Sequence, residues 1–340
     1  MKKWNTLLLA ALAGIGLSGV AAAQAINAAG ATFPYPIYSR WFDAYHKAHP
    51  SIEINYQSIG SGGGITQLKA GTVDFAASDR PMTDEEIKEC KYRPLHFPTV
   101  LGAVVIAYNL PSVKVDLKFD AQLIADIYMM KVKKWNDPEI TKLNPGVKMP
   151  STDILVIHRS EGSGTTFIFT DFLSKTVPEW KSKVGADQQP KWPGGLGEKG
   201  NEAVAGYVKQ TEGAIGYVEL AYVLQNHMQS GIVKNGAGHF VRPTIDTVTA
   251  AAAGAAKSMP ADFRVSITDA PGADAYPISS FTWMLIPSTI PDANKKTAIT
   301  GFLEWMLTEG QKIAPEAPLY YAPLPANVAA KEKAQIKLVK

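Results

Sequence analysis

Three segments of the chain repeat one order of elements: an apolar strand, a glycine-rich loop and an amphipathic helix. In the clearest segment, alternating apolar residues at 52–57 precede the loop "IGSGGG". Ile65 and Leu68 then share a helix face, Gly71 is a plausible helix C-cap, and an apolar run follows at 73–77. Strand–helix–strand order predicts parallel strands joined by crossover helices, so the chain should fold as an α/β protein.

The same order occurs twice more. One copy begins with a short strand at Ile26, and the other with a strand at 154–157 whose loop leads into a helix near residue 165. Further along, Asn201 is the expected N-cap of a helix that runs to Gln210. A final amphipathic helix is expected at 295–309.

Each loop places glycine and a hydroxyl side chain at the start of a helix. The first N–H groups of a helix have no partner inside it, and the helix dipole adds partial positive charge there. Glycine lets the backbone approach a ligand closely, and hydroxyls add hydrogen-bond donors. The hydroxyl residues in question are Thr32, Ser61, Ser163 and Thr165. Three such loops in one chain favour a small oxyanion as the ligand.

Arg159 follows the third strand and strengthens this hypothesis. Its guanidinium group is a fixed fork of donors that suits phosphate-like oxygens. Glu161, two residues later, is placed to hold that fork. An ordinary surface ion pair between the two residues is the alternative, and such a pair would contribute little energy.

Asp79 is the unexpected residue, because a carboxylate should repel an anion. The repulsion is relieved if the ligand carries a proton, since an ionised carboxylate only accepts hydrogen bonds. Phosphate near neutral pH has at least one O–H, whereas sulfate has none, so Asp79 would favour phosphate over sulfate. The alternatives are that Asp79 caps a strand end or pairs with its neighbour Arg80.

Composition limits the other functional classes. Hydrophobic residues make up 46% of the chain, charged residues 19%, and the formal net charge is +3. These values are typical of a folded globular protein and do not indicate nucleic-acid binding. The one cysteine, Cys90, rules out an internal disulfide and is expected to be an ordinary thiol on a helix surface.

The N-terminus has the pattern of a secretory signal peptide. Lys2 and Lys3 precede an apolar stretch at 7–20, and small residues near Ala23 and Ala25 offer cleavage sites. We therefore expect residues 1–23 to be removed on export, with no lipid anchor because no cysteine lies near the cleavage point.

A hydrolase is the main competing class. Its nucleophile would be Ser61, Ser163 or Cys90, but the chain lacks a Gly-x-Ser-x-Gly elbow around Ser163. The histidines lack metal-site spacing apart from His46 and His49, which are more simply explained as solvated helix-end residues. No metal or cofactor is expected. A basic cluster at 131–134 beside Trp135 is a further candidate, for docking, although a solvated surface accounts for it equally.

The loops as a set resemble those of the periplasmic phosphate-binding proteins of high-affinity phosphate ABC importers. The matching segments, in order, are "GATFPYPIY", "IGSGGG", "TVDFAASD", "RSEGSGTTFIFTDFL", "WPGGLGEKGNEAVAGYV", "EGAIGYVELAY" and "YYAPLP". The resemblance implies an α/β fold of the two-lobe periplasmic-binding-protein type (type II), with a ligand cleft between lobes joined by two crossover strands. Lobe one would comprise 26–108 and 278–340, and lobe two 109–277.

The same resemblance implies the site and the partners. The implied phosphate-binding residues are Ala31, Thr32, Phe33, Ser61, Asp79, Arg159, Ser163, Gly164 and Thr165. Glu161 stands where the family usually has the aspartate that orients the arginine, so a modest effect on affinity is expected. The implied protein is a periplasmic monomer that delivers inorganic phosphate to the permease subunits of an ABC transporter. A binder of another oxyanion, such as sulfate or molybdate, is the nearest alternative.

Overall fold

The structure is a computed structural model that describes residues 24–257 and 259–340. The expected signal peptide, residues 1–23, lies outside the described residues. Within them, no helix combines the length and the apolar character needed to cross a membrane.

Nine strands of the described chain form one mixed sheet in the order β2-β1-β3-β12-β4-β8-β6-β7, with β9 beside β4, and three short strands form a second sheet, β11-β10-β5. The strands are β1 (Gln24–Gly30), β2 (Ile52–Ser58), β3 (Phe75–Ser78), β4 (Pro94–Tyr108), β5 (Lys118–Phe119), β6 (Leu155–Arg159), β7 (Leu196–Glu198), β8 (Ala214–Glu219), β9 (Gln229–Ser230), β10 (Ile232–Lys234), β11 (Phe240–Val241) and β12 (Ser279–Pro287). The predicted parallel pairing is confirmed, since β1 pairs in parallel with β2 and β3, and β6 with β7 and β8.

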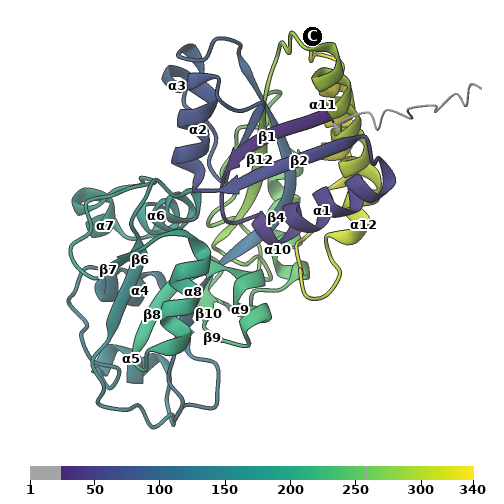
Figure 1. Cartoon of the computed structure of the whole chain (residues 1–340). Helices are drawn as coiled ribbons and strands as arrows, with labels where there is room; N and C mark the ends of the chain where they lie inside the picture. The colour runs from purple at the N-terminus through teal and green to yellow at the C-terminus, as the bar shows by residue number, and fades with distance from the viewer. Residues whose placement is uncertain (1–23, 258) are drawn as a thin grey trace, which may run out of the picture.

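Strand β4 connects the two halves of the large sheet. Its first part, 94–103, pairs with β12, and its last part, 104–108, pairs with β8. Figure 1 shows the consequence: β1, β2 and β12 lie with α1, α2 and α11 in one half, while β6–β8 lie with α4–α9 in the other. The two halves therefore meet where β4 changes its pairing partner.

The helices cover both halves of the sheet (Figure 1). They are α1 (Tyr35–Ala48), α2 (Ser61–Ala70), α3 (Asp84–Lys88), α4 (Ala121–Tyr128), α5 (Pro138–Leu143), α6 (Gly164–Thr176), α7 (Pro178–Lys183), α8 (Gly200–Gln210), α9 (Leu220–Asn226), α10 (Ile245–Lys257), α11 (Ala293–Trp305), the π-helical turn η1 (Met306–Gly310), α12 (Gln311–Ile313) and α13 (Ala326–Ile336).

Local sequence explains how the crossover helices begin and end. Pro36 lies in the first turn of α1, where its missing N–H costs nothing. Gly71 ends α2 in the left-handed conformation with φ of 69°, as predicted. Ser163 caps α6 by accepting a hydrogen bond from the Thr166 amide at 3.1 Å. The starts of α1 and α6 thereby lie a few residues after the ends of β1 and β6.

One detail of the predicted helices is wrong. The helix expected at 295–309, which the structure has as α11 and η1, is not the last, because α13 follows it. In α13 the buried positions include Glu332 and Gln335 beside Val328 and Ile336, so polar residues interrupt the apolar periodicity that marks a helix in sequence.

Candidate functional site

The three predicted loops converge where the two halves of the sheet meet. A Cβ atom added to Gly164, at the start of α6, would lie 2.4 Å from Ser61 Oγ and 2.7 Å from Asp79 Oδ2. The start of α6 thus abuts both the start of α2 and the end of β3. Since only a hydrogen fits at this position, glycine is required for the approach.

Asp79 is buried in this cluster, with 1% of its surface exposed. Its Oδ1 atom accepts a hydrogen bond from Thr282 Oγ1 at 2.8 Å, and its Oδ2 atom has no hydrogen-bond partner in the described chain. Burial raises the pKa of Asp79 to about 7, although Thr282, Arg159 and Ser61 act in the opposite direction. Near neutral pH, the group is therefore able both to accept and to release a proton.

The neighbouring arginine supplies the positive charge. Arg159 is 2% exposed, and its Nε atom donates to Glu161 Oε1 at 3.0 Å, with Nη2 contacting the same oxygen. Glu161 Oε1 also accepts from the Gly200 amide at 3.0 Å. Arg159 Nη1 is buried without a partner among the described residues. The side chain of Glu161, although longer than the aspartate usual in the family, thus still reaches the guanidinium group of Arg159, and Nη1 is left without a partner in the described chain.

The four predicted hydroxyls share one property: each accepts a hydrogen bond from an N–H group of the chain. Ser61 Oγ accepts from the Asp79 amide at 3.1 Å, and Ser163 Oγ accepts from Thr166 as described. Thr32 Oγ1 and Thr165 Oγ1 both accept from Asn201. A hydroxyl that accepts from an N–H keeps its own hydrogen for donation, so these groups favour an anionic ligand.

The first loop differs from its expected role in one respect. The Ala31 amide donates to Ala77 O at 3.0 Å and is therefore committed to the sheet. Phe33 is fully buried, and its carbonyl accepts from Tyr321 Oη at 2.7 Å. Because this bond occupies the Ala31 amide, the donors proposed for this loop are those of Thr32 and Phe33, and Ala31 stays among the proposed binding residues without a donor of its own.

Sequence reasoning missed two polar residues of the cluster. Thr282 lies on β12, far along the chain from Asp79, and no local motif marks it. Asn201 was expected to cap a helix, but α8 begins at Gly200 and its N-cap is Lys199. The Asn201 side chain is fully buried and bonds to Thr32 and Thr165 instead.

Arg80 does not pair with Asp79, which answers one of the open alternatives. Arg80 forms a two-pronged ion pair with Glu86, and its Nε donates to Gln188 Oε1 at 2.9 Å. Gln188 belongs to the other half of the molecule, and its carbonyl accepts from the Ser163 amide. Arg80 thus links β3 to the segment that supports the third loop.

The remaining candidates lie outside this cluster. No group of three potential ligand side chains that would hold a metal occurs within 24–257 and 259–340, so His46 and His49 gain no support. Cys90 lies after α3 and is half-buried, not on a helix surface, and burial raises the pKa of its thiol. In the basic cluster, Lys131 pairs with Asp126 and Glu179, and Trp135 is fully buried.

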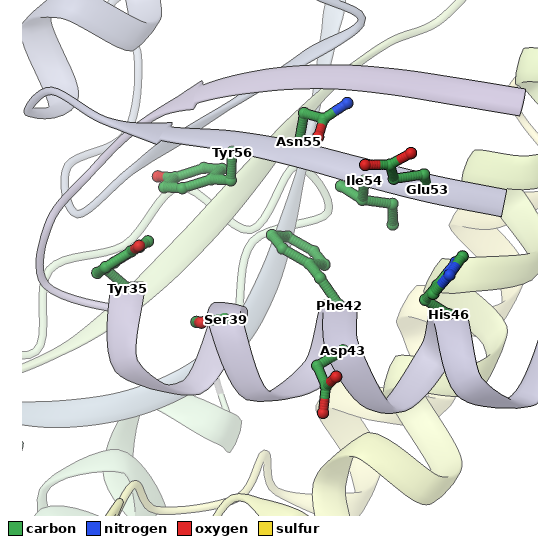
Figure 2. Close-up of a pocket in the computed structure, with 9 residues that line it drawn as sticks. All are labelled: Tyr35, Ser39, Phe42, Asp43, His46, Glu53, Ile54, Asn55 and Tyr56. Carbon is green, nitrogen blue, oxygen red and sulfur yellow. The ribbon is translucent and has the colours of Figure 1, made fainter. Parts of the chain in front are cut away.

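A separate surface hollow lies between α1 and β2. Figure 2 shows Phe42 reaching from α1 toward Ile54 and Tyr56 on β2, whereas Asp43 points away from the strand. Tyr35 and Tyr56 stack with ring centroids 6.3 Å apart. None of the predicted site residues lines this hollow, so it is distinct from the cluster around Asp79.

Comparisons with known proteins identify the family of this chain. Residues 18–309 match the model of the PBP superfamily domain. A phosphate-binding protein PstS of Xylella fastidiosa is 46% identical over 304 residues, covering 89% of this chain and 82% of the relative. Another PstS, from Haemophilus influenzae, is 43% identical and covers 95% of this chain and 96% of the relative.

Solved structures show the same fold at lower identity. A high affinity periplasmic phosphate-binding protein (PfluDING) solved with phosphate has a TM-score of 0.73 and 22% identity, covering 92% of this chain and 93% of that chain. A putative phosphate ABC transporter substrate-binding protein from Clostridium perfringens, also with phosphate, has a TM-score of 0.64 and 19% identity, covering 89% and 100%.

Proposed function

This chain belongs to the PstS family of phosphate-binding proteins and has their two-lobe fold. We propose that it captures inorganic phosphate between its lobes. It releases the ion to the permease of a phosphate ABC importer and works as a monomer in the periplasm. It is a binding protein and not an enzyme. We assign residues 26–108 with 278–340 to one lobe and residues 109–277 to the other, with β4 running from the first lobe into the second.

One observation carries the proposal: a buried acceptor and a buried donor without protein partners lie in one cluster. Asp79 Oδ2 and Arg159 Nη1 both lack a hydrogen bond in the described chain. Leaving such groups unpaired costs about 1–3 kcal/mol each, and more when they are charged. A ligand that both accepts and donates hydrogen bonds would satisfy the two groups, and protonated phosphate is such a ligand.

The proposed ligand residues are those of the three loops with the acid and the arginine: Ala31, Thr32, Phe33, Ser61, Asp79, Arg159, Ser163, Gly164 and Thr165. Ala31 shapes the loop, since its amide is paired in the sheet. Hydroxyls and amides at the helix starts donate to three ligand oxygens, while Asp79 binds the oxygen that carries the proton. Glu161 holds Arg159 in position.

Contacts between the halves explain how the ion would be enclosed. The Gly62 amide donates to Gly162 O at 2.9 Å, and Ser58 Oγ contacts Glu202 Oε1 at 3.2 Å. These bonds join the first turn of α2 to the third loop, and the end of β2 to α8. Closure of the lobes would therefore remove water from the ligand and strengthen its hydrogen bonds.

Titration calorimetry with purified mature protein tests the proposal. Phosphate should bind tightly, sulfate should not compete at pH 8, and native mass spectrometry should find phosphate retained on the protein. Arg159→Lys keeps the positive charge but loses the planar set of N–H donors of the guanidinium group, so it should weaken phosphate binding. Good competition by sulfate or molybdate at pH 8 would refute phosphate specificity and favour the alternative oxyanion binder.

A phosphatase assay tests the enzymatic alternative. The hydroxyls of Ser61 and Ser163 each bond to a backbone amide, and a nucleophile needs an adjacent base instead. Turnover of a phosphate ester that disappears in Ser163→Ala while phosphate binding persists would overturn the assignment as a binding protein.

A further inference from the structure

We propose that Asn201 is a positioning residue for two ligand hydroxyls, one from each lobe: it makes the Thr32 hydroxyl a hydrogen-bond donor and biases the Thr165 hydroxyl the same way. The inference rests on the proposed function of the site and names a residue outside the loops that the sequence marks. Asn201 lies in the first turn of α8 and is fully buried.

The orientation of the Asn201 amide follows from its neighbours. The Glu219 backbone N–H donates to Asn201 Oδ1 at 2.9 Å. Because a backbone N–H group is only a donor, the oxygen of the side chain must face it. The nitrogen Nδ2 must then face Thr32 and Thr165, and it has two hydrogens to donate to them.

Both hydrogens of Nδ2 are used on hydroxyl oxygens. Nδ2 lies 2.7 Å from Thr32 Oγ1 and 3.1 Å from Thr165 Oγ1, and the Asn201 backbone N–H donates to Thr32 Oγ1 at 3.1 Å. A hydroxyl oxygen has two lone pairs and one hydrogen. Both lone pairs of Thr32 are therefore filled, so its hydroxyl is left only with the ability to donate. Thr165 has one lone pair filled and is biased the same way.

This arrangement links the donor character of Thr32 to closure of the lobes. Thr32 follows β1 in lobe one, whereas Asn201 and Thr165 belong to lobe two. The Thr32 carbonyl also accepts from Tyr222 Oη of lobe two at 2.6 Å. When the lobes separate, Thr32 loses both N–H groups and its hydroxyl is again free to accept. Closure thus completes a set of donors that selects a ligand with acceptor oxygens.

A double-mutant cycle tests the inference, with phosphate dissociation constants from calorimetry as the readout. Asn201→Ala should weaken phosphate binding about 10-fold in the wild-type background, because the hydroxyls lose their enforced polarity. In the Thr32→Val background, which has no hydroxyl, the same change should weaken binding by only about 3-fold or less. Thr32→Ser keeps the hydroxyl and should restore the full dependence on Asn201.

Controls separate this role from a structural one. Asn235→Ala removes another buried asparagine, which bonds to the carbonyls of Gly272, Ala273 and Ala275, and should lower thermal stability without changing phosphate affinity. Asn201→Asp keeps the shape but offers acceptors in place of donors, so it should weaken phosphate binding about 100-fold.

Equal effects of Asn201→Ala in the two Thr32 backgrounds would overturn the inference, as would an Asn201→Asp variant that binds phosphate as tightly as wild type. Either result leaves the proposed function intact, because wild type would still bind phosphate. Failure of the wild type to bind phosphate would instead refute the function itself.

Discussion

Acidification should admit sulfate to the site, because the group that excludes sulfate is a buried carboxyl with a raised pKa. The ionised form of Asp79 presents lone pairs at Oδ2 to a ligand, and sulfate has no hydrogen to give them. The folded-state pKa is about 7, above the ordinary value of 3.8. The excluding carboxylate therefore dominates above pH 7, and the neutral, hydrogen-donating acid dominates below it.

The size of the effect follows from the fraction of neutral Asp79. With a pKa of about 7, roughly 3% of the group is neutral at pH 8.5 and roughly 97% at pH 5.5. If only the neutral form admits sulfate, the apparent affinity for sulfate scales with that fraction. The expected gain is then about 30-fold between pH 8.5 and pH 5.5. Phosphate keeps at least one O–H across this range, so its affinity should change less.

Calorimetric titration of sulfate at several pH values provides the measurement, with Asp79→Asn as the control. The asparagine variant should bind sulfate at every pH with little pH dependence, because its amide is always able to donate a hydrogen bond. A sulfate affinity that stays flat in the wild type from pH 5.5 to pH 8.5 would refute the reasoning. So would an Asp79→Asn variant that still excludes sulfate.

Three further predictions follow from the same site. Asp79→Asn should raise the free energy of unfolding of the ligand-free protein at pH 8 by at most about 4 kcal/mol, measured by urea titration, because the variant buries no charge at this position. In the wild type, the destabilisation by the buried carboxylate is absent below pH 3.8, where the carboxyl is neutral in the folded and the unfolded state, and it is complete above pH 7. Glu161→Gln should weaken phosphate binding about 10-fold by calorimetry, because Arg159 loses a charged partner while the Gly200 amide keeps an acceptor; unchanged affinity would contradict this role. Gly164→Ala should reduce phosphate affinity at least about 100-fold, since the added Cβ would lie 2.7 Å from Asp79 Oδ2. Gly206→Ala is the control and should leave the affinity unchanged, because a Cβ there meets nothing within 4 Å. Similar affinities of the two variants would argue against a closed site at the start of α6.

The elements that the sequence predicted well are those defined by local chemistry. The alternation at 52–57, the loop at Ser61 and the C-cap at Gly71 each lie within a few residues of the element they specify, and the structure has β2, α2 and a left-handed Gly71 there. The loops of the candidate site could be found for the same reason, because glycine and hydroxyl residues at a helix start mark an anion site without any tertiary information.

The residues that sequence reasoning missed act across long separations. Thr282 and Asp79 are 203 residues apart, and Asn201 and Thr32 are 169 apart. Asn201 also stands at a helix start, where capping is the ordinary use of asparagine, and only the packed structure shows that its side chain is used elsewhere. Helix α13 was missed because Glu332, fully buried with its pKa raised far above the usual range, occupies a position where an apolar residue would signal a helix.

Strand β4 restricts how the molecule can open. Its 15 residues form a single ribbon whose backbone is bonded to β12 over one stretch and to β8 over the next. Each ladder lies within one half of the molecule, so a bend of β4 between Ala103 and Val104 would leave both ladders intact, and we expect the lobes to open by rotation about that point. Such a rotation would leave each lobe internally unchanged, so each loop would return to the same place whenever the lobes close. We therefore expect the geometry that would discriminate between ions to form again at each closure.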